Sequence, residues 1–153
     1  MSMNESAAPR LVVPAMSGLY EALAPYSYAF MRFCVGAILV PHGYAKLFHG
    51  AVNNVATMVG GWGLQPAMAW AYWIGILEFV GGIMIAVGFL TRPVAFMVAF
   101  EMAVAMFMVH WGNGYFWTSR GFEYPMMWGL LCLAIAVRGG DRLSVDRALG
   151  REI

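Results

Sequence analysis

Long apolar stretches dominate this chain and decide what it can fold into. Of its 153 residues, 61% are hydrophobic and 11% are charged, against roughly a quarter charged in an ordinary soluble domain. Four membrane spans of about 20 residues need roughly 80 apolar positions. The composition supplies these positions and leaves little for a separate soluble domain. Because the predicted connections are short, we expect an all-α membrane protein, a four-transmembrane-helix antiparallel bundle.

Polar segments and prolines set the bounds of the predicted spans, which cover about residues 27–48, 69–90, 94–111 and 123–137. A polar segment, 49–66, separates the first two spans. Residues 91–93 (Thr-Arg-Pro) are expected to form a tight turn, because proline cannot continue a helix. Ser17 is expected to cap a short interfacial helix over 17–24, and Ser144 to cap one turn of helix near the C-terminus.

The chain is predicted to divide into an N-terminal cytoplasmic or interfacial segment (1–25), a transmembrane domain (26–138) and a charged cytoplasmic tail (139–153). Four spans place both termini on one side of the membrane. Basic residues favour that side by six to two: Arg10, Arg92, Arg138, Arg142, Arg147 and Arg151 against Lys46 and Arg120. By the positive-inside rule, both termini are therefore expected in the cytoplasm, with the protein in the bacterial inner membrane.

Charge and cysteine content exclude several functions. A net charge of +1 gives no indication of nucleic acid or of a strongly acidic ligand as partner. Cys34 and Cys132 lie in separate apolar runs with no C-x-x-C motif, which excludes the disulfide exchange of thiol-to-quinone enzymes. The 13 methionines are expected to fill the core or face lipid, and no metal site is predicted.

Four ionisable residues interrupt the predicted spans: Arg32, Lys46, Glu78 and Glu101. Each costs about 2.5–3.5 kcal/mol at the bilayer centre, so each needs a partner or water unless it reaches the interface. Lys46 is near a helix end and is expected to reach it. From the rise per residue, Arg32 and Glu101 lie about 8 and 11 Å from the same side, which predicts that they pair. Glu78 is expected to be shared between Arg32 and the level of His42 and Lys46.

Charges and small residues share one face of the first span: Arg32, Gly36, Leu39, Gly43 and Lys46 fall within about 40° of one line. Helix packing is expected to use Gly36 and Gly43 in the first span and Gly75, Gly81, Gly82 and Gly88 in the second. A kink at Pro41 beside His42 is expected to open a pocket toward the outer leaflet. In a regular helix Glu101 and His110 lie about 180° apart, which disfavours a haem held between His42 and His110.

The intramembrane charges allow three interpretations. They can form a site for a polar or redox-active lipid-soluble molecule, which is the usual reason for such residues in a membrane. They can instead only fix helix register and packing, because buried ion pairs also occur without a ligand. They can also serve conduction of an ion or small solute. All six tryptophans fall on or near the predicted outer face, which favours a pocket or a docking surface there.

A series of short motifs resembles the DoxX family of small four-helix membrane proteins. In chain order they are His42-Gly43-x-x-Lys46, Glu78-x-x-Gly81-Gly82, Gly88-x-x-Thr91-Arg92, His110-x-x-Asn113-Gly114, Gly121-x-Glu123-Tyr124-Pro125 and Ser144-x-Asp146-Arg147. They cover roughly residues 28–147. The segment before Tyr26 is longer than the family requires.

The resemblance implies a redox setting, because the family takes its name from a subunit of a terminal quinol oxidase fed by thiosulfate oxidation. It also implies a polar site formed by Arg32, His42, Lys46, Glu78, Glu123 and Tyr124, to which the sequence itself adds Glu101 and His110 as candidates. The chain has no cofactor motif of its own, so electron transfer would need a bound quinone or a partner.

We therefore predict a quinone- or quinol-linked accessory subunit of an inner-membrane redox complex. In this prediction His42 or Lys46 hydrogen-bonds a quinone carbonyl, and Glu78 accepts or relays a proton. The expected partners are the lipid bilayer and either other integral membrane subunits or further copies of the chain. The alternative is a non-catalytic structural or assembly subunit of a larger membrane complex.

Overall fold

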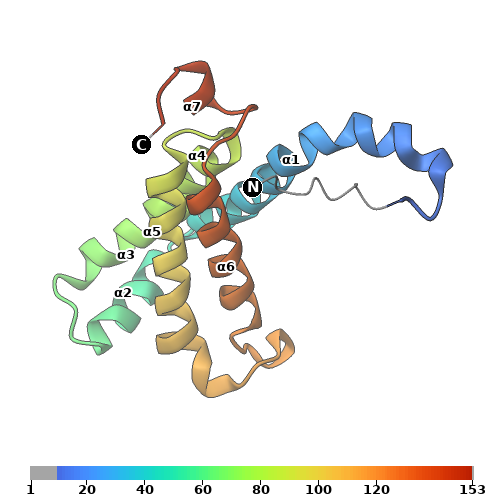
Figure 1. Ribbon diagram of the computed structural model, residues 1–153. Coiled ribbons are helices and arrows are strands. Elements are labelled where there is room, and N and C mark those ends of the chain that lie inside the picture. The colour runs from blue at the N-terminus through green and yellow to red at the C-terminus, as the bar shows by residue number, and fades with distance from the viewer. Residues whose placement is uncertain (1–9, 153) are drawn as a thin grey trace, which may run out of the picture.

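The structure is a computed structural model that describes residues 10–152, and over that range it contains helices and no strand (Figure 1). Residues 1–9 of the predicted N-terminal segment, and residue 153, lie outside the described range. The elements are η1 (Pro14–Met16), α1 (Ser17–Phe48), α2 (Val52–Gly61), α3 (Ala67–Ile76), η2 (Leu77–Gly81), α4 (Gly82–Val87), α5 (Thr91–Val104), η3 (Ala105–His110), η4 (Trp111–Asn113), η5 (Trp117–Ser119), α6 (Glu123–Arg138) and α7 (Val145–Ala148).

Three helical segments are long and apolar enough to cross a membrane: Pro14–Phe48, Ala67–Val87 and Thr91–Asn113. The second segment joins α3, η2 and α4 without a break, and the third joins α5, η3 and η4. α6 has 16 residues, which corresponds to about 24 Å. The all-helical prediction is therefore confirmed, and the first three predicted spans lie in helices that are long and apolar enough to cross a membrane. The fourth span stays a prediction.

α1 is one continuous helix, so the prediction of a separate interfacial helix over residues 17–24 is wrong. Pro25 and Pro41 both lie inside it. Two residues after Pro25, the Ser27 hydroxyl donates a hydrogen bond to the carbonyl of Ala24, the residue before the proline, at 2.8 Å. Ser17 is the first residue of α1 and makes no cap bond, because Met16 occupies the cap position. In Figure 1 the first half of α1 extends away from the other helices.

Two segments that the sequence suggests to be irregular are helical. Within 49–66, α2 buries Val52, Ala56 and Val59 at helical spacing, and the first two belong to a small core with Ala71 of α3. The turn expected at 91–93 lies earlier in the chain, where Gly88 and Leu90 adopt left-handed conformations. Thr91–Pro93 then forms the first turn of α5, where a proline is tolerated because its missing amide hydrogen has no partner there.

Glycine contacts bring α1 close to the second apolar segment. A Cβ at Gly36 would lie 2.9 Å from Ala86 Cα, and one at Gly43 would lie 2.7 Å from the Gly75 carbonyl oxygen. Neither space can hold a side chain, which confirms the predicted packing through small residues. The buried residues of α1 include Arg32, Gly36, Leu39 and Gly43, so the predicted inward face of the first span is also confirmed.

α5 and α6 run side by side and enclose most of the main core (Figure 1). Val98 and Met102 of α5 and Cys132 and Ile135 of α6 are all buried there. The indole nitrogen of Trp128 donates a hydrogen bond to the Val35 carbonyl at 3.2 Å. This bond ties α6 to α1.

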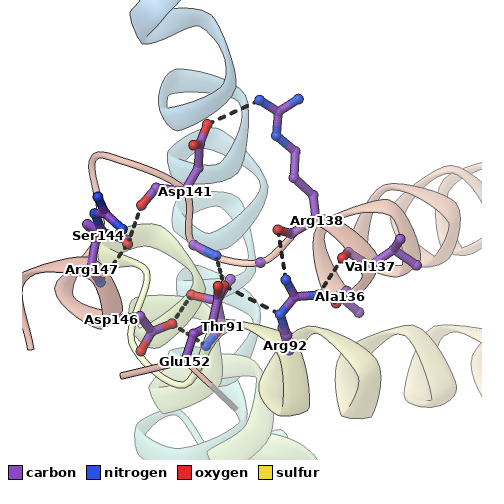
Figure 2. A network of polar contacts seen from close by, with 12 residues as sticks. Thr91, Arg92, Ala136, Val137, Arg138, Asp141, Ser144, Asp146, Arg147 and Glu152 are labelled. Carbon is purple, nitrogen blue, oxygen red and sulfur yellow. Dashed lines mark hydrogen bonds and ion pairs between the residues drawn. The ribbon is translucent and has the colours of Figure 1, made fainter. Parts of the chain in front are cut away.

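The C-terminal tail folds back onto the bundle end where α4 meets α5 (Figure 2). The Asp146 carboxylate accepts hydrogen bonds from the Leu90 amide at 2.7 Å, the Thr91 amide at 2.9 Å and the Thr91 hydroxyl at 2.6 Å. These two amides belong to the start of α5, which has no side-chain cap of its own. Asp146 therefore caps α5 from 55 residues away. Ser144 accepts from the Arg147 amide at 3.1 Å, which confirms the predicted cap.

Arg92 of α5 connects α6 with the end of the tail. Its guanidinium donates to the carbonyls of Ala136, Val137 and Arg138, at the C-terminal end of α6, where a cation is favoured by the helix dipole. Glu152 lies 3.5 Å from Arg92 and accepts from the Gly140 amide at 2.8 Å. We call residues 88–92 and 139–152 together the tail junction.

We expect Asp146→Asn to destabilise the protein at neutral pH by about 1–3 kcal/mol, because an amide group cannot replace a charged acceptor of three hydrogen bonds. Burial acts to raise the pKa of Asp146, but the bonds from Thr91 and Leu90 and the charge of Arg32 outweigh it and hold the pKa below its ordinary value. The carboxylate therefore stabilises the fold above its unfolded pKa, about 3.9, and this contribution is lost as pH falls through the lower folded pKa.

Thermal unfolding of the detergent-purified protein at several pH values checks this prediction. Asp141→Asn is the matched control, because Asp141 forms an ion pair with the exposed Arg138, and such pairs contribute about 0–1 kcal/mol. Equal melting temperatures of Asp146→Asn and wild type at pH 7 would contradict the capping role.

Candidate functional site

The structure distributes the eight predicted site residues over three places. Arg32 lies at the tail junction. A second group lies around η2, which contacts both α1 and α5: His42, Lys46, Glu78 and Glu101. The third group lies around the loop after η3: His110, Glu123 and Tyr124.

Lys46 and Glu78 form a buried ion pair. Lys46 lies in the last turn of α1 and Glu78 in η2, and the ammonium donates directly to the carboxylate. Their side chains are only 18% and 8% exposed. The pair depends on close helix contact, since a Cβ at Gly75 would lie 3.3 Å from the Cβ of Lys46. The expected contact of Glu78 with Lys46 is confirmed, and Lys46 pairs instead of extending to the interface.

Glu101 of α5 is a second acidic residue near this ion pair, but it lies beyond ion-pair distance of Lys46. It interacts electrostatically with both Glu78 and Lys46. One of its carboxylate oxygens is buried and has no hydrogen-bond partner among the described residues. Two acidic groups from different elements thus lie near one ammonium, and only Glu78 pairs with it. The site has one acidic group more than Lys46 can neutralise, which makes it suited to hold or pass a proton.

Both acidic residues lie in or near π-helical turns. Glu78 is the second residue of η2, and η3 begins four residues after Glu101. Single π turns within α-helices are rare and often occur at functional sites. They also change the direction of the side chains that follow, so the angle between Glu101 and His110 expected for a regular helix does not apply.

A pocket of about 380 Å³ lies beside the ion pair. Its lining comes from the end of α1 (Pro41, His42, Ala45 and Lys46) and from α2 and the residue before it (Ala51, Asn54 and Val55). The predicted pocket at Pro41 and His42 is therefore present. Asn54 is a lining residue that the sequence did not identify, because two adjacent asparagines are weak helix formers and concealed α2.

Arg32 forms an ion pair with neither Glu101 nor Glu78, so the predicted pair with Glu101 and the predicted sharing of Glu78 with Arg32 are both wrong. Its guanidinium donates to the carbonyls of Ile85 at 2.8 Å, Ala86 at 3.2 Å and Leu143 at 2.5 Å. The side chain fits because Gly88 has no Cβ, which would lie 2.7 Å from the guanidinium carbon. Carbonyls at the end of a helix have no partner within it and attract a cation. Arg32 therefore fixes the end of α4 to the tail.

The remaining predicted residues shape the loop between η3 and α6. The His110 ring lies 2.7 Å from the Arg120 carbonyl oxygen. Glu123 accepts a hydrogen bond from the Trp117 amide at 3.0 Å, and Tyr124 stacks on the Trp117 ring with centroids 5.5 Å apart. These contacts join both ends of one loop, which is a sufficient structural role for all three side chains.

Known proteins resemble this chain over most of its length. The DoxX family model matches residues 27–111, more than half of the chain. A protein of Haemophilus influenzae described as uncharacterized is 33% identical over 131 residues, which cover 82% of this chain and 92% of that relative. No solved structure matches significantly. Together with the three apolar helical segments, these matches identify a multi-pass membrane protein that belongs to the DoxX family.

Proposed function

We propose that this protein is a quinone- or quinol-linked accessory subunit of a redox complex in the bacterial inner membrane. The observation that carries the proposal is that His42 and Lys46 line one pocket, and that the same lysine pairs with Glu78. Membership of the DoxX family supports a membrane protein with a link to redox chemistry.

The pocket has the groups that a quinone head group needs. His42, Lys46 and Asn54 supply hydrogen-bond donors for the two carbonyls, and Pro41, Ala45 and Val55 supply an apolar wall for the ring. Ligand sites of this kind combine mostly apolar walls with a few placed polar groups. The isoprenoid tail would remain in the surrounding lipid.

The charged residues behind the pocket supply a route for protons. Reduction of a quinone to a quinol takes up two electrons and two protons. In our proposal Lys46 and Glu78 pass protons to the head group, and Glu101 acts as their store because it is the acidic group that no cation neutralises. The described residues contain no redox cofactor motif, so the electrons come from a partner subunit.

The proposed arrangement in the membrane has α6 as the fourth span and both termini in the cytoplasm. α6 is about 24 Å long, somewhat shorter than a hydrocarbon core of about 30 Å. Glu123 and Arg138 stand at its two ends and can reach the interfaces with their side chains. The tail junction would then face the cytoplasm and the loop around Trp117 the periplasm.

A non-catalytic structural subunit is the second candidate, and Arg32 favours it. Among residues 10–152, Arg32 is the most buried charged residue, 2% exposed, and its hydrogen bonds connect structural elements. Exposed phenylalanines such as Phe30 and Phe100, at 69% and 65%, would then contact neighbouring subunits as well as lipid.

We expect His42→Ala and Asn54→Ala each to reduce the quinone retained by the purified protein several-fold, and both together by about tenfold or more. Each change removes one head-group hydrogen bond worth about 1 kcal/mol. Quinone is extracted from the gently purified protein and measured by chromatography per folded protein. His49→Ala and Asn53→Ala are the matched controls, because these neighbouring residues do not line the pocket.

Two outcomes of this measurement would contradict the proposal. One is equal quinone retention in the His42→Ala and His49→Ala variants. The other is wild-type protein without quinone that stays attached to a larger complex, which would decide for the structural subunit.

Reporter fusions test the orientation. Fusions after residues 92 and 150 are expected to report the cytoplasm, and a fusion after residue 117 the periplasm, because basic residues concentrate at the tail junction. A periplasmic signal at residue 150 would reverse the orientation and place the pocket toward the cytoplasmic leaflet.

A further inference from the structure

Four arginines of the C-terminal region share one pocket, separate from the pocket at His42. This pocket has a volume of about 430 Å³ and lies on the tail side of the bundle. Its lining includes Arg138, Arg142, Arg147 and Arg151, together with Asp141, Asp146 and Glu152. The arginines follow one another at intervals of four or five residues, and the folded tail turns them toward one space.

The acidic residues of this pocket already have partners. Asp141 pairs with Arg138 at 3.1 Å, and Glu152 with Arg92 at 3.5 Å, while Asp146 caps α5. Within residues 10–152, Arg142, Arg147 and Arg151 take part in no ion pair. The pocket is therefore cationic, although the whole chain is nearly neutral.

Apolar side chains alternate with these arginines and are also exposed. Leu143 is 47% exposed, Val145 36% and Leu149 61%. The tail begins directly after α6, at the end of an apolar helix. Exposed apolar residues that alternate with arginines along a segment next to an apolar helix are typical of a surface that binds lipid head groups and the adjoining acyl chains.

The tail is held firmly in this place. Arg32 and Asp146 bind it to the end of α4 and the start of α5. Arg142 also donates to the Pro25 carbonyl of α1 at 3.4 Å, and Tyr28 donates to the Gly139 carbonyl at 2.6 Å. The arginines are therefore presented on a fixed backbone, which lowers the entropy lost when a ligand binds.

We propose that this pocket binds the phosphate group of an anionic phospholipid. Arg142, Arg147 and Arg151 would donate to the phosphate oxygens, for which the planar guanidinium is well suited. Leu143, Val145 and Leu149 would contact the upper part of the acyl chains. The exposed apolar side chains favour a lipid over free inorganic phosphate, because inorganic phosphate has no apolar part that could contact them. This proposal does not depend on the quinone proposal.

Lipid titration of the delipidated full-length protein tests the proposal, with native mass spectrometry as the readout. The probes are dioleoylphosphatidylglycerol, dioleoylphosphatidylcholine and inorganic phosphate. We expect saturable binding of the anionic lipid and weak binding of the neutral one. Each of Arg142→Gln, Arg147→Gln and Arg151→Gln should weaken anionic-lipid binding about fivefold, and the triple variant on the order of a hundredfold.

Arg10→Gln with Arg120→Gln is the matched control, because these arginines do not line the pocket and their loss should leave lipid binding unchanged. Helical circular dichroism and the melting temperature verify that each variant is folded. The proposal is overturned if the folded triple variant binds the anionic lipid as tightly as the control does. It is also overturned if inorganic phosphate alone saturates the pocket and excludes the lipid, or if both lipids bind equally well.

Discussion

The ion pair between Lys46 and Glu78 is the interaction on which the arrangement of the first two membrane helices depends. A single unpaired charge in hydrocarbon costs about 2.5–3.5 kcal/mol. Sliding one helix along the other would separate Lys46 from Glu78 and would therefore incur this cost for each residue. Gly43 and Gly75 let the two backbones come close enough for the contact. Because Lys46 also lines the pocket beside His42, the same interaction that fixes the helix register also places the polar end of the pocket.

The remaining charges divide into two systems with different roles. At the tail junction, Arg32 and Asp146 bind backbone carbonyls and amides at helix ends, and they serve the fold. At the level of Glu78, that residue pairs with Lys46, and a buried oxygen of Glu101 has no hydrogen-bond partner among the described residues. The proposed proton route uses this group. The four arginines of the C-terminal region add a cationic surface that the net charge of +1 conceals, because eight acidic residues, only three of them in this pocket, offset the basic residues of the whole chain.

Helical periodicity was enough to predict the inward face of α1, the small residues predicted the glycine contacts, and Pro41 beside His42 predicted the pocket. The pairing of the charges could not be predicted in full. The rise per residue placed Arg32 and Glu101 at similar depths in the membrane. It could not show that free carbonyls at the end of α4 lie closer to Arg32 than Glu101 does. The π turns at η2 and η3 leave no local signal in the sequence and change the phase of every residue after them. α2 was missed because its asparagines suggested a loop, although Val52, Ala56 and Val59 already had helical spacing.

A double-mutant cycle for Lys46→Met and Glu78→Gln, with the free energy of unfolding measured in mixed micelles, tests the assignment of the charges most directly. Each single change should cost about 3–5 kcal/mol because it leaves a buried charge unpaired. The double change should cost at least about 2 kcal/mol less than the sum of the two. Arg32→Gln and Glu101→Gln, measured in the same way, should be additive within about 0.5 kcal/mol. Additive effects for Lys46 and Glu78, together with strong coupling of Arg32 to Glu101, would contradict the account.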